Sequence, residues 1–232
     1  MSPTDPPLLR RLLEPGDPAT PEQIAAEVRA DFGGRNPSVA VNMVGSVDGT
    51  ATLGGRSGGL SGPADRALFH ALRGATDAVL VGAATAVAEG YGPMRPIACI
   101  ASRRLALPPD LPLLRDPASR VVILTGATET LPPTAASVEY LREGDLGASL
   151  RRLHERWGVE RVLCEGGPRL NATLFEQDLV DELLLTISPV LAGGSGVRIV
   201  DGPPLTPPRP VQLASLFEHG DFLFARYRVK RA

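Results

Sequence analysis

The segment Arg161-Val162-Leu163-Cys164-Glu165-Gly166-Gly167-Pro168-Arg169-Leu170 decides the fold of this chain. Its first residues predict a short buried strand, the two glycines end that strand, and proline is favoured at the first position of a helix. The N–H groups at a helix N-terminus lack partners and carry partial positive charge, and glycines let an anion approach the backbone. The segment therefore predicts an anion site, with Glu165 facing the same crevice. Taken alone, it fits a plain strand-to-helix turn equally well.

The composition is that of an ordinary globular protein, and its near-zero net charge favours a small molecule as the partner. The chain has 232 residues, 43% hydrophobic and 22% charged. Its 24 basic and 26 acidic side chains nearly balance, which argues against nucleic acid or an anionic membrane as a partner. No apolar run approaches the roughly 20 residues of a membrane helix, and residues 1–7 lack a signal-peptide pattern. We expect a cytoplasmic protein with Cys99 and Cys164 as buried, reduced thiols.

Strand-like apolar runs alternate with helical patterns along most of the chain. Alternating runs at residues 210–217 and 222–229 flank Glu218-His219-Gly220-Asp221, whose composition favours a hairpin. This order predicts a three-layer α/β/α fold with a mostly parallel mixed sheet that ends in an antiparallel hairpin. The expected strands before that hairpin are residues 38–44, 77–82, 97–101, 121–126, 137–141, 159–164 and 182–190, and the helices lie at residues 63–73, from 83, at 146–157 and from 168.

One domain, preceded by an arm, is the predicted organisation. Residues 1–37 are rich in proline and contain one amphipathic helix, residues 21–29, with Thr20 as its N-cap. Residues 38–232 show no internal repeat and no linker, so they are expected to form a single domain. A glycine-rich loop at residues 50–62 is long enough to predict a functional role. Asp65, in the helix that follows, is expected on a solvated face.

Small or polar residues follow several of the predicted parallel strands, which places them at one edge of the sheet. A dinucleotide lying along that edge would meet all of them, with glycines under its phosphates. Arg103 or Arg104 is then available to a 2′-phosphate. The fingerprint Gly-x-Gly-x-x-Gly of a Rossmann fold is missing after the first strand. The strand-end segments are Gly82-Ala83-Ala84-Thr85, Ser102-Arg103, Thr125-Gly126 and Gly166-Gly167.

A serine hydrolase is the main rival in the sequence. Gly55-Arg56-Ser57-Gly58-Gly59 matches Gly-x-Ser-x-Gly, and Asp201 and His219 follow in the order of a triad. That motif needs a strand before the serine and a helix after it, whereas residues 52–54 make a poor strand and two glycines would break the helix. We therefore disfavour a hydrolase. The three histidines show no metal-ligand spacing with one another or with the cysteines, so no metal site is expected.

Together these residues resemble the reductase domain of the riboflavin-pathway deaminase-reductases, which is related in fold to dihydrofolate reductase. The resemblance covers roughly residues 38–230 and rests on five segments in the same order. These segments are Ser46-Val47-Asp48-Gly49; Gly62 with Arg66, His70, Leu72 and Arg73; Asp77-Ala78-Val79-Leu80-Val81-Gly82 with Thr85; Glu165-Gly166-Gly167-Pro168; and Leu179-Val180-Asp181-Glu182 leading to Pro189 and Gly193-Gly194.

The resemblance implies a homodimeric, NADPH-dependent reductase that transfers a hydride to C1′ of a ribosylaminopyrimidine phosphate. It implies catalytic roles for Asp48 and Glu165, and substrate binding by Ser46, Arg66 and Arg95, with an arginine for the phosphate. Because the cofactor supplies the hydride, the protein has to align the two molecules and supply a proton. The implied cofactor residues are Gly82, Ala83, Thr85, Ser102, Arg103, Thr125, Gly126, Gly166, Gly167 and Leu170.

Three substrate-side positions differ from the family pattern. Asn42 stands where the family usually has lysine, Ser61 where it has threonine, and Glu89 where it has aspartate. Loss of the lysine charge leaves reduction of dihydrofolate or another pterin open as an alternative. A nucleotide-binding sensor without turnover is the non-enzymatic alternative. The deaminase signature His-x-Glu followed by Pro-Cys-x-x-Cys is absent from these residues, so we expect no zinc deaminase half.

Overall fold

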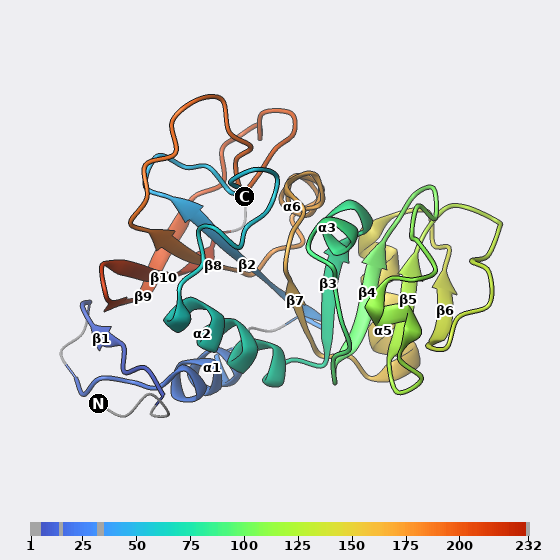
Figure 1. Cartoon of the computed structure of the whole chain (residues 1–232), viewed down its shortest axis with the longest axis horizontal. Coiled ribbons are helices and arrows are strands. Elements are labelled where there is room, and N and C mark those ends of the chain that lie inside the picture. Colours follow the sequence, from blue (N-terminus) through green and yellow to red (C-terminus); the bar gives the residue numbers. More distant parts are fainter. Residues whose placement is uncertain (1–5, 14–15, 32–34, 231–232) are drawn as a thin grey trace.

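A computed structural model describes residues 6–13, 16–31 and 35–230 of the chain (Figure 1). Residues 1–5, where the predicted arm starts, lie outside the described residues. Within these described residues, ten strands form one sheet in the order β1-β9-β10-β8-β2-β7-β3-β4-β5-β6. The strands are β1 (Arg10–Arg11), β2 (Ser38–Ser46), β3 (Ala78–Gly82), β4 (Ile97–Ala101), β5 (Arg120–Leu124), β6 (Ser137–Leu141), β7 (Arg161–Cys164), β8 (Glu182–Ser188), β9 (Val211–His219) and β10 (Phe222–Val229).

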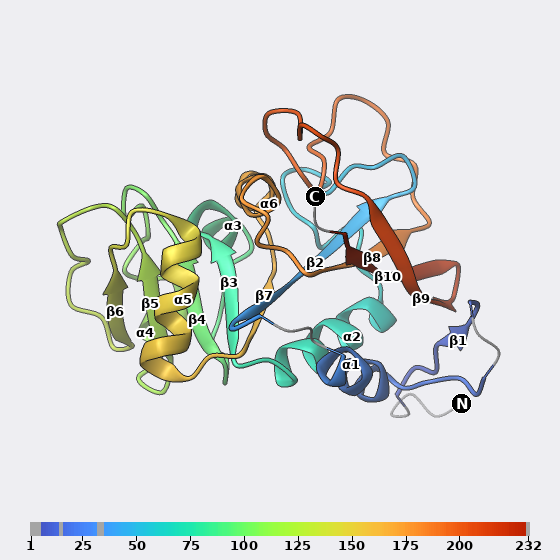
Figure 2. The same cartoon turned by 180° about the vertical axis from the view of Figure 1, so that it is seen from behind.

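In the part of the chain that the structure describes, six helices flank the sheet on its two faces (Figures 1 and 2). The helix predicted in the arm is confirmed, because the side chain of Thr20 accepts from the N–H of Gln23 and completes a capping box. Gly62 caps the next helix at a position where a Cβ would lie 2.8 Å from the Phe222 ring. The helices are α1 (Pro21–Ala30), α2 (Pro63–Gly74), α3 (Ala83–Ala88), α4 (Pro112–Arg115), α5 (Leu146–Trp157) and α6 (Pro168–Glu176).

The sheet is parallel from β8 through β2, β7, β3, β4 and β5 to β6, and antiparallel where β8, β10, β9 and β1 pair. The predicted mixed sheet and C-terminal hairpin are thereby confirmed. β2 extends two residues beyond its predicted end because Gly45 and Ser46 pair with Ile187 and Ser188 of β8. The sequence did not predict β1, which has only two residues, or α4, which has four.

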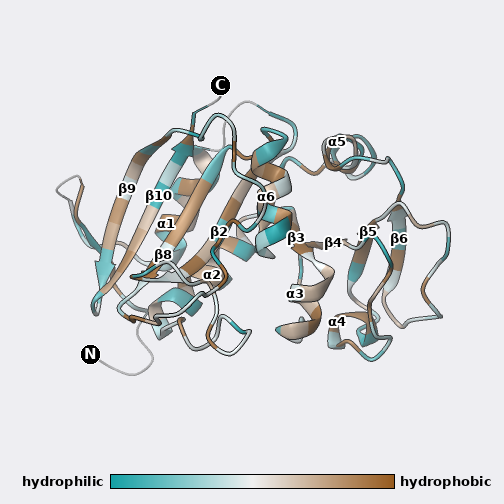
Figure 3. Ribbon diagram, turned by 90° about the horizontal axis from the view of Figure 1, so that it is seen from above, coloured by the Kyte–Doolittle hydropathy of each residue, from teal (hydrophilic) through white to brown (hydrophobic). Residues whose placement is uncertain are grey.

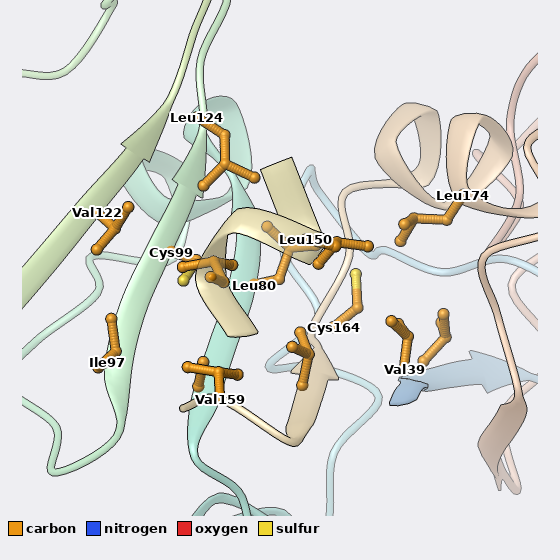
Figure 4. Close-up of a cluster of buried hydrophobic side chains, with 14 of the residues drawn as sticks. Val39, Leu80, Ile97, Cys99, Val122, Leu124, Leu150, Val159, Cys164 and Leu174 are labelled. Carbon is orange, nitrogen blue, oxygen red and sulfur yellow. The ribbon is translucent and has the colours of Figure 1, made fainter. Parts of the chain in front are cut away.

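The core lies on both faces of the sheet, which confirms the three layers. On one face, Leu80, Cys99 and Val122 pack with Leu150 of α5 and Leu174 of α6 (Figure 4). The opposite face packs against the first four helices, with one cluster under α3 and α4 and another under α1 and α2. Strands β2 and β8 are coloured mostly as hydrophobic where they pass between these layers (Figure 3). Burial of both faces explains why the parallel strands are continuous apolar runs.

The described residues of the N-terminal region, 6–13 and 16–31, contribute to the core and to the sheet. Ile24 and Val28 of α1 join Leu68 and Leu72 of α2 in one buried cluster. β1 forms an antiparallel pair with β9, and Leu9 is completely buried. None of the helices within residues 6–13, 16–31 and 35–230 is long and apolar enough to cross a membrane.

Candidate functional site

The carboxyl ends of β7, β3, β4 and β5 lie side by side, which confirms the predicted common edge. Leu80 pairs with Cys164, and Ala101 pairs with both Gly82 and Leu124, so the four strands end at nearly the same level. Backbone hydrogen bonds also join the segments beyond the strand ends. The N–H of Gly82 donates to the Gly166 carbonyl oxygen at 2.9 Å, and the N–H of Ser102 donates to Leu124 at 3.0 Å.

The turn after β7 requires glycine at both of its positions. Gly166 has a φ of +89°, and a Cβ built on it would lie 2.9 Å from the Met43 sulfur. A Cβ on Gly167 would lie 2.7 Å from the Oγ1 of Thr85. The peptide bond between the two glycines is cis. Because the first helical hydrogen bond of α6 runs from Asn171 to Gly167 at 3.0 Å, the preceding N–H groups have no partner within the helix.

A cavity of about 590 Å³ adjoins this turn on the α2 and α3 side of the sheet. Its walls come from the end of β2, the glycine-rich loop, α2, α3 with the segment after it, and the β7 turn. The predicted functional role of the loop is consistent with this placement, since Gly55, Ser57, Gly58 and Ser61 all contribute to the wall. Of the predicted site residues, the cavity brings together Asn42, Ser61, Arg66, Thr85, Glu89, Glu165 and Gly167.

Glu165 is the centre of a buried polar cluster at one end of the cavity. Its Oε1 accepts from the Nε of Arg73 and its Oε2 from Nη2, both at 2.6 Å. The Tyr91 hydroxyl also donates to Oε2, at 2.7 Å. The guanidinium carbon of Arg73 lies 4.2 Å from the Phe69 ring centroid and 5.1 Å from that of Tyr91. The arginine is therefore held by charge, by hydrogen bonds and between two aromatic rings.

Burial and the charge of the Glu165 carboxylate shift the pKa values of Tyr91 and Arg73. Burial, and then the charge of Glu165, raise the pKa of Tyr91 well above its usual value, so the phenol stays a hydrogen-bond donor. Burial alone would lower the pKa of Arg73, but the hydrogen bond and charge of Glu165 outweigh it, and the net result is a raised pKa. The raised pKa values keep the Arg73 guanidinium charged and the Tyr91 phenol protonated where both donate to the Glu165 carboxylate.

The other charged residues of the cavity wall differ in their partners. The Oδ2 of Asp65 accepts from the Ser61 hydroxyl at 2.5 Å, and the Oε1 of Glu89 accepts from the N–H of Ser57 at 2.7 Å. Arg66 donates to the Ser61 carbonyl oxygen at 3.2 Å, and no carboxylate of the described residues forms an ion pair with it. An arginine without a carboxylate partner at a cavity wall suits an anionic ligand.

Three of the predicted substrate-side residues do not line the cavity. Ser46 is buried and donates to the Oδ1 of Asp48 at 2.5 Å. The two oxygens of Asp48 also accept from the N–H groups of Ala192 at 3.1 Å and Gly193 at 2.6 Å. The Ser46 hydroxyl and these backbone bonds lower the pKa of Asp48 to about 2. Asp48 thus holds the segment after β8, while Arg95 is exposed in the segment before β4.

The predicted cofactor residues extend from the cavity along the strand ends. Thr85 and Gly167 belong to both regions, because they also line the cavity. Thr125 is buried, and its Oγ1 accepts from the N–H of Ala127 at 3.1 Å. Arg103 is exposed directly after Ser102. The remaining predicted positions at or next to this edge are Gly82, Ala83, Ser102, Gly126, Gly166 and Leu170.

Sequence reasoning missed several residues of the wall. Arg73 belongs to one of the five segments on which the family resemblance rests, but no role in the site was assigned to it. Tyr91 was not among the predicted site residues. A signal for Tyr91 was present, since a large aromatic residue between two glycines, Gly90 and Gly92, follows the end of α3. Asp65, which was expected on a solvated face, is partly buried at the cavity wall, where its side chain accepts from the Ser61 hydroxyl.

The hydrolase arrangement is not formed around Ser57. Leu53 and Arg56 make an isolated bridge before Ser57, and no helix begins until Pro63. The ring of His219 lies on β9, with its Nδ1 2.9 Å from the carbonyl oxygen of Leu8. In the part of the chain that the structure describes, no group of three or more His, Cys, Asp or Glu residues is arranged to hold a metal ion.

The mostly parallel sheet, its antiparallel end and the cavity at its carboxyl edge define a dihydrofolate-reductase-like α/β protein. Dihydrofolate reductase from Enterococcus faecalis, solved with NADP(H), shares this fold, with a TM-score of 0.51, 13% identity and coverage of 84% of this chain and 98% of that one. The family model of the RibD C-terminal domain matches residues 37–221, and the chain belongs to that family.

Two curated relatives and one similar solved structure each cover between 71% and 92% of the chain. A 2,5-diamino-6-ribosylamino-4(3H)-pyrimidinone 5′-phosphate reductase of Methanothermobacter thermautotrophicus is 30% identical over 220 residues, which cover 84% of this chain and 99% of the relative. The riboflavin biosynthesis protein RibD of Mycobacterium tuberculosis is 27% identical over 71% of this chain and 46% of its own length. A pyrimidine reductase-like protein from Corynebacterium diphtheriae has a TM-score of 0.76 at 23% identity, covering 92% of this chain and all of that one.

Proposed function

We propose that this protein is an NADPH-dependent reductase of riboflavin biosynthesis that acts on a ribosylaminopyrimidine phosphate. One observation carries this proposal: the polar cavity and the strand-end edge meet at Thr85 and Gly167. An acceptor in the cavity and a dinucleotide along the edge would therefore come into contact at that point. The match to the archaeal reductase along almost its whole length supports the choice of acceptor.

The residues at the edge fit a nicotinamide dinucleotide. The two glycines of the β7 turn have no side chain to obstruct a pyrophosphate, and the N-terminus of α6 offers N–H groups. Gly126 faces open space at the end of β5, where a ribose or base can lie. Arg103 supplies a cation for the 2′-phosphate that distinguishes NADPH from NADH. When bound, the reduced nicotinamide supplies the hydride.

The residues of the cavity would hold the acceptor. In this proposal Arg66 binds the substrate phosphate, since it has no carboxylate partner among the described residues. Asn42, Ser61 and Glu89 contribute polar atoms to the same wall, and Glu165 with its partners forms the polar end. Asp48 acts from a distance by holding the segment that carries Val197 into the cavity wall. Ser46 supports Asp48 through its hydroxyl.

The test is to mix the protein with NADPH and follow the absorbance of the reduced nicotinamide with each candidate acceptor in turn. We expect oxidation with the ribosylaminopyrimidine phosphate and none with dihydrofolate. Oxidation only with dihydrofolate or another pterin would replace the proposed substrate. Cofactor binding without oxidation by any acceptor would favour a nucleotide-binding sensor, and failure to bind NADPH would reject both.

We also propose that the protein is a homodimer. Support comes from the face of β8, β10 and β9 opposite to α1 and α2, where Leu185, Leu216 and Leu223 are only partly buried. A second copy would remove these side chains from water. Light scattering in solution measures the mass directly, and a monomer at micromolar concentration would reject this part of the proposal.

A further inference from the structure

The loop at residues 126–131, which follows β5 at the strand-end edge, is bonded by a single arginine. Arg142 stands directly after β6, the strand beside β5 at one end of the sheet (Figure 1). Its Nε donates to the carbonyl oxygen of Ala127 at 2.7 Å. Its Nη2 donates to the carbonyl oxygens of Thr128 at 3.3 Å and Glu129 at 2.8 Å. One guanidinium therefore binds three successive carbonyl groups of this loop.

Tyr140 and Thr125 hold the two ends of the same loop. The hydroxyl of Tyr140, on β6, accepts from the N–H of Leu131 at 2.8 Å. The guanidinium carbon of Arg142 lies 4.6 Å from the Tyr140 ring centroid, so the ring also supports the arginine. At the start of the loop, the Oγ1 of Thr125 accepts from the N–H of Ala127 at 3.1 Å. The backbone is thus fixed at its start, along its middle and at its end.

The contacts of Arg142 determine the direction of the loop's N–H groups. In a trans peptide the C=O group and the N–H of the next residue point in opposite directions, and no peptide bond within residues 126–131, all of them described, is cis. The N–H groups of Thr128, Glu129 and Thr130 are therefore directed away from Arg142. These residues are exposed, and none of the three N–H groups donates to another described residue. Successive free N–H groups of this kind can bind an anion.

An exposed cation stands on the opposite side of β5 from Arg142. β4 and β6 are the two neighbours of β5, and Ala101 pairs with Leu124, so β4 and β5 end together about 4.8 Å apart. Arg103 lies two residues beyond the end of β4 and is exposed. No carboxylate of the described residues forms an ion pair with it. An anion between these two strand ends would meet a free guanidinium and free N–H groups.

We infer that the loop at residues 126–131 binds the 2′-phosphate of NADPH together with Arg103, and that Arg142 is a positioning residue that orients the loop. The inference rests on the proposed function. That function assigns the pyrophosphate to the β7 turn, which leaves the 2′-phosphate as the remaining anionic group of the coenzyme. It also places the nicotinamide near Thr85 and Gly167, so the adenosine half belongs over β4 and β5, the next strands along the edge. Arg142 turns the carbonyl oxygens away from this phosphate and leaves the N–H groups for it.

Glu129 is the single acidic residue of the loop and gives a test of opposite sign. It is exposed, and no cation of the described residues forms an ion pair with it. Its carboxylate would repel a phosphate held by the N–H groups of this loop. Glu129→Gln should therefore bind NADPH about twofold to fivefold more tightly, with NADH affinity unchanged. A purely structural role of the loop would not produce this gain.

The main experiment is a fluorescence titration of NADPH and NADH against the full chain, Arg142→Ala, Tyr140→Phe and the double variant. We expect Arg142→Ala to weaken NADPH about tenfold and to leave NADH within twofold of the wild type. Tyr140→Phe changes no charge but releases the end of the loop, so it should weaken NADPH about twofold to fivefold. In the Arg142→Ala background its effect should be smaller, because the loop is already released. The acceptor KM at saturating NADPH should stay within twofold of the wild type.

Arg156→Ala is the matched control. The guanidinium carbon of Arg156 also lies 4.6 Å from an aromatic ring centroid, that of Trp157, and the arginine pairs with Glu139 of β6, but it bonds no carbonyl of the loop. Its loss should change neither coenzyme affinity, and a comparable loss of NADPH affinity in this control overturns the inference. If Tyr140→Phe binds NADPH as the wild type does, Arg142 acts through its charge and the positioning role is overturned.

The remaining outcomes separate the inference from the proposed function. Equal weakening of NADPH and NADH by Arg142→Ala, or no weakening of NADPH, overturns the inference alone. So does a wild type that binds both coenzymes equally well while it reduces the acceptor. A wild type that binds neither coenzyme overturns the proposed function, and the inference with it. Thermal unfolding checks each variant, and if Arg142→Ala does not fold, unchanged NADPH affinity in Glu129→Gln still overturns the inference.

Discussion

The backbone N–H of Gly82, at the end of β3, donates to the carbonyl oxygen of Gly166 beyond the end of β7, at 2.9 Å. This bond fixes the turn after β7 against the start of α3. Thr85 on α3 consequently lies close to Gly167, at the point where the cavity and the strand-end edge meet. The geometry of both proposed binding regions therefore depends on two glycines.

Replacement of Gly167 by alanine tests this dependence. A Cβ there would lie 2.7 Å from the Thr85 oxygen, so α3 or the turn has to shift. We expect a destabilisation of about 1 to 3 kcal/mol, as for other overpacked sites, together with a clear loss of NADPH affinity. Thermal unfolding and a cofactor titration measure the two effects. Gly74→Ala is the control, because no atom lies within 4 Å of its Cβ position, and NADPH affinity equal to wild type in Gly167→Ala would contradict the expectation.

Arg103→Ala tests the choice between NADPH and NADH. Arg103 is exposed after β4, where it can pair with a 2′-phosphate. Loss of charge-assisted hydrogen bonds should weaken NADPH binding about tenfold to a hundredfold and leave NADH binding unchanged. Fluorescence titration with each coenzyme gives the ratio. Arg120→Ala, at the opposite end of β5, should change neither affinity, and equal weakening of both coenzymes by Arg103→Ala would argue against a 2′-phosphate contact.

The low pKa of Asp48 predicts how the segment after β8 responds to acid. Because its pKa is lowered to about 2 in the folded protein, the stabilisation from Asp48 is present above about pH 4 and is lost as the pH falls towards 2. A carboxyl NMR titration should give a midpoint near 2, with the Ala192 and Gly193 amide shifts following it. Ser46→Ala removes the largest cause of the lowered pKa and should raise the midpoint. In Asp48→Asn the two amides should no longer titrate in this range, and an unshifted midpoint in Ser46→Ala would contradict this origin of the low pKa.

The two buried thiols should react differently in the native and the unfolded protein, and they should lower the stability of the fold at high pH. Burial raises the pKa of both Cys99 and Cys164 to about 12. Neither should react with an aromatic disulfide reagent at pH 8 in the native state, and both should react after unfolding. Since the folded pKa values exceed those of the unfolded chain, the stabilisation is complete below about pH 9 and is lost as the pH rises towards 12. A thiol that reacts rapidly in the native protein would contradict its burial.

Much of the fold could be predicted because the apolar runs in the sequence are the segments that the folded protein buries. β4 was predicted with its exact bounds, since Ile97–Ala101 is a continuous apolar run that follows Pro96 and is ended by Ser102. β1 gave no such signal, because Arg10 and Arg11 join the sheet through backbone bonds to β9. The four residues of α4 are too few to show a helical period.

The site was only partly predictable, because some of its contacts join segments that are far apart in the sequence. Strand ends can be located along the chain, so the carboxyl edge followed from the expectation of parallel strands. The pairing of Arg73 with Glu165 depends on how the fold brings α2 against the β7 turn, which no local pattern records. The same holds for the contact between Asp48 and Gly193, because it depends on β2 pairing with β8.

The position of β2 in the sheet has a consequence for the synthesis of this chain on the ribosome. β2 lies between β7 and β8, whose first residues are Arg161 and Glu182, so both of its edges stay unpaired until those strands have emerged. Its apolar residues Val39 and Val41 are exposed during that interval. The nascent protein thus has a period in which it is open to chaperone binding and to aggregation, and that period ends only when β8 has been translated.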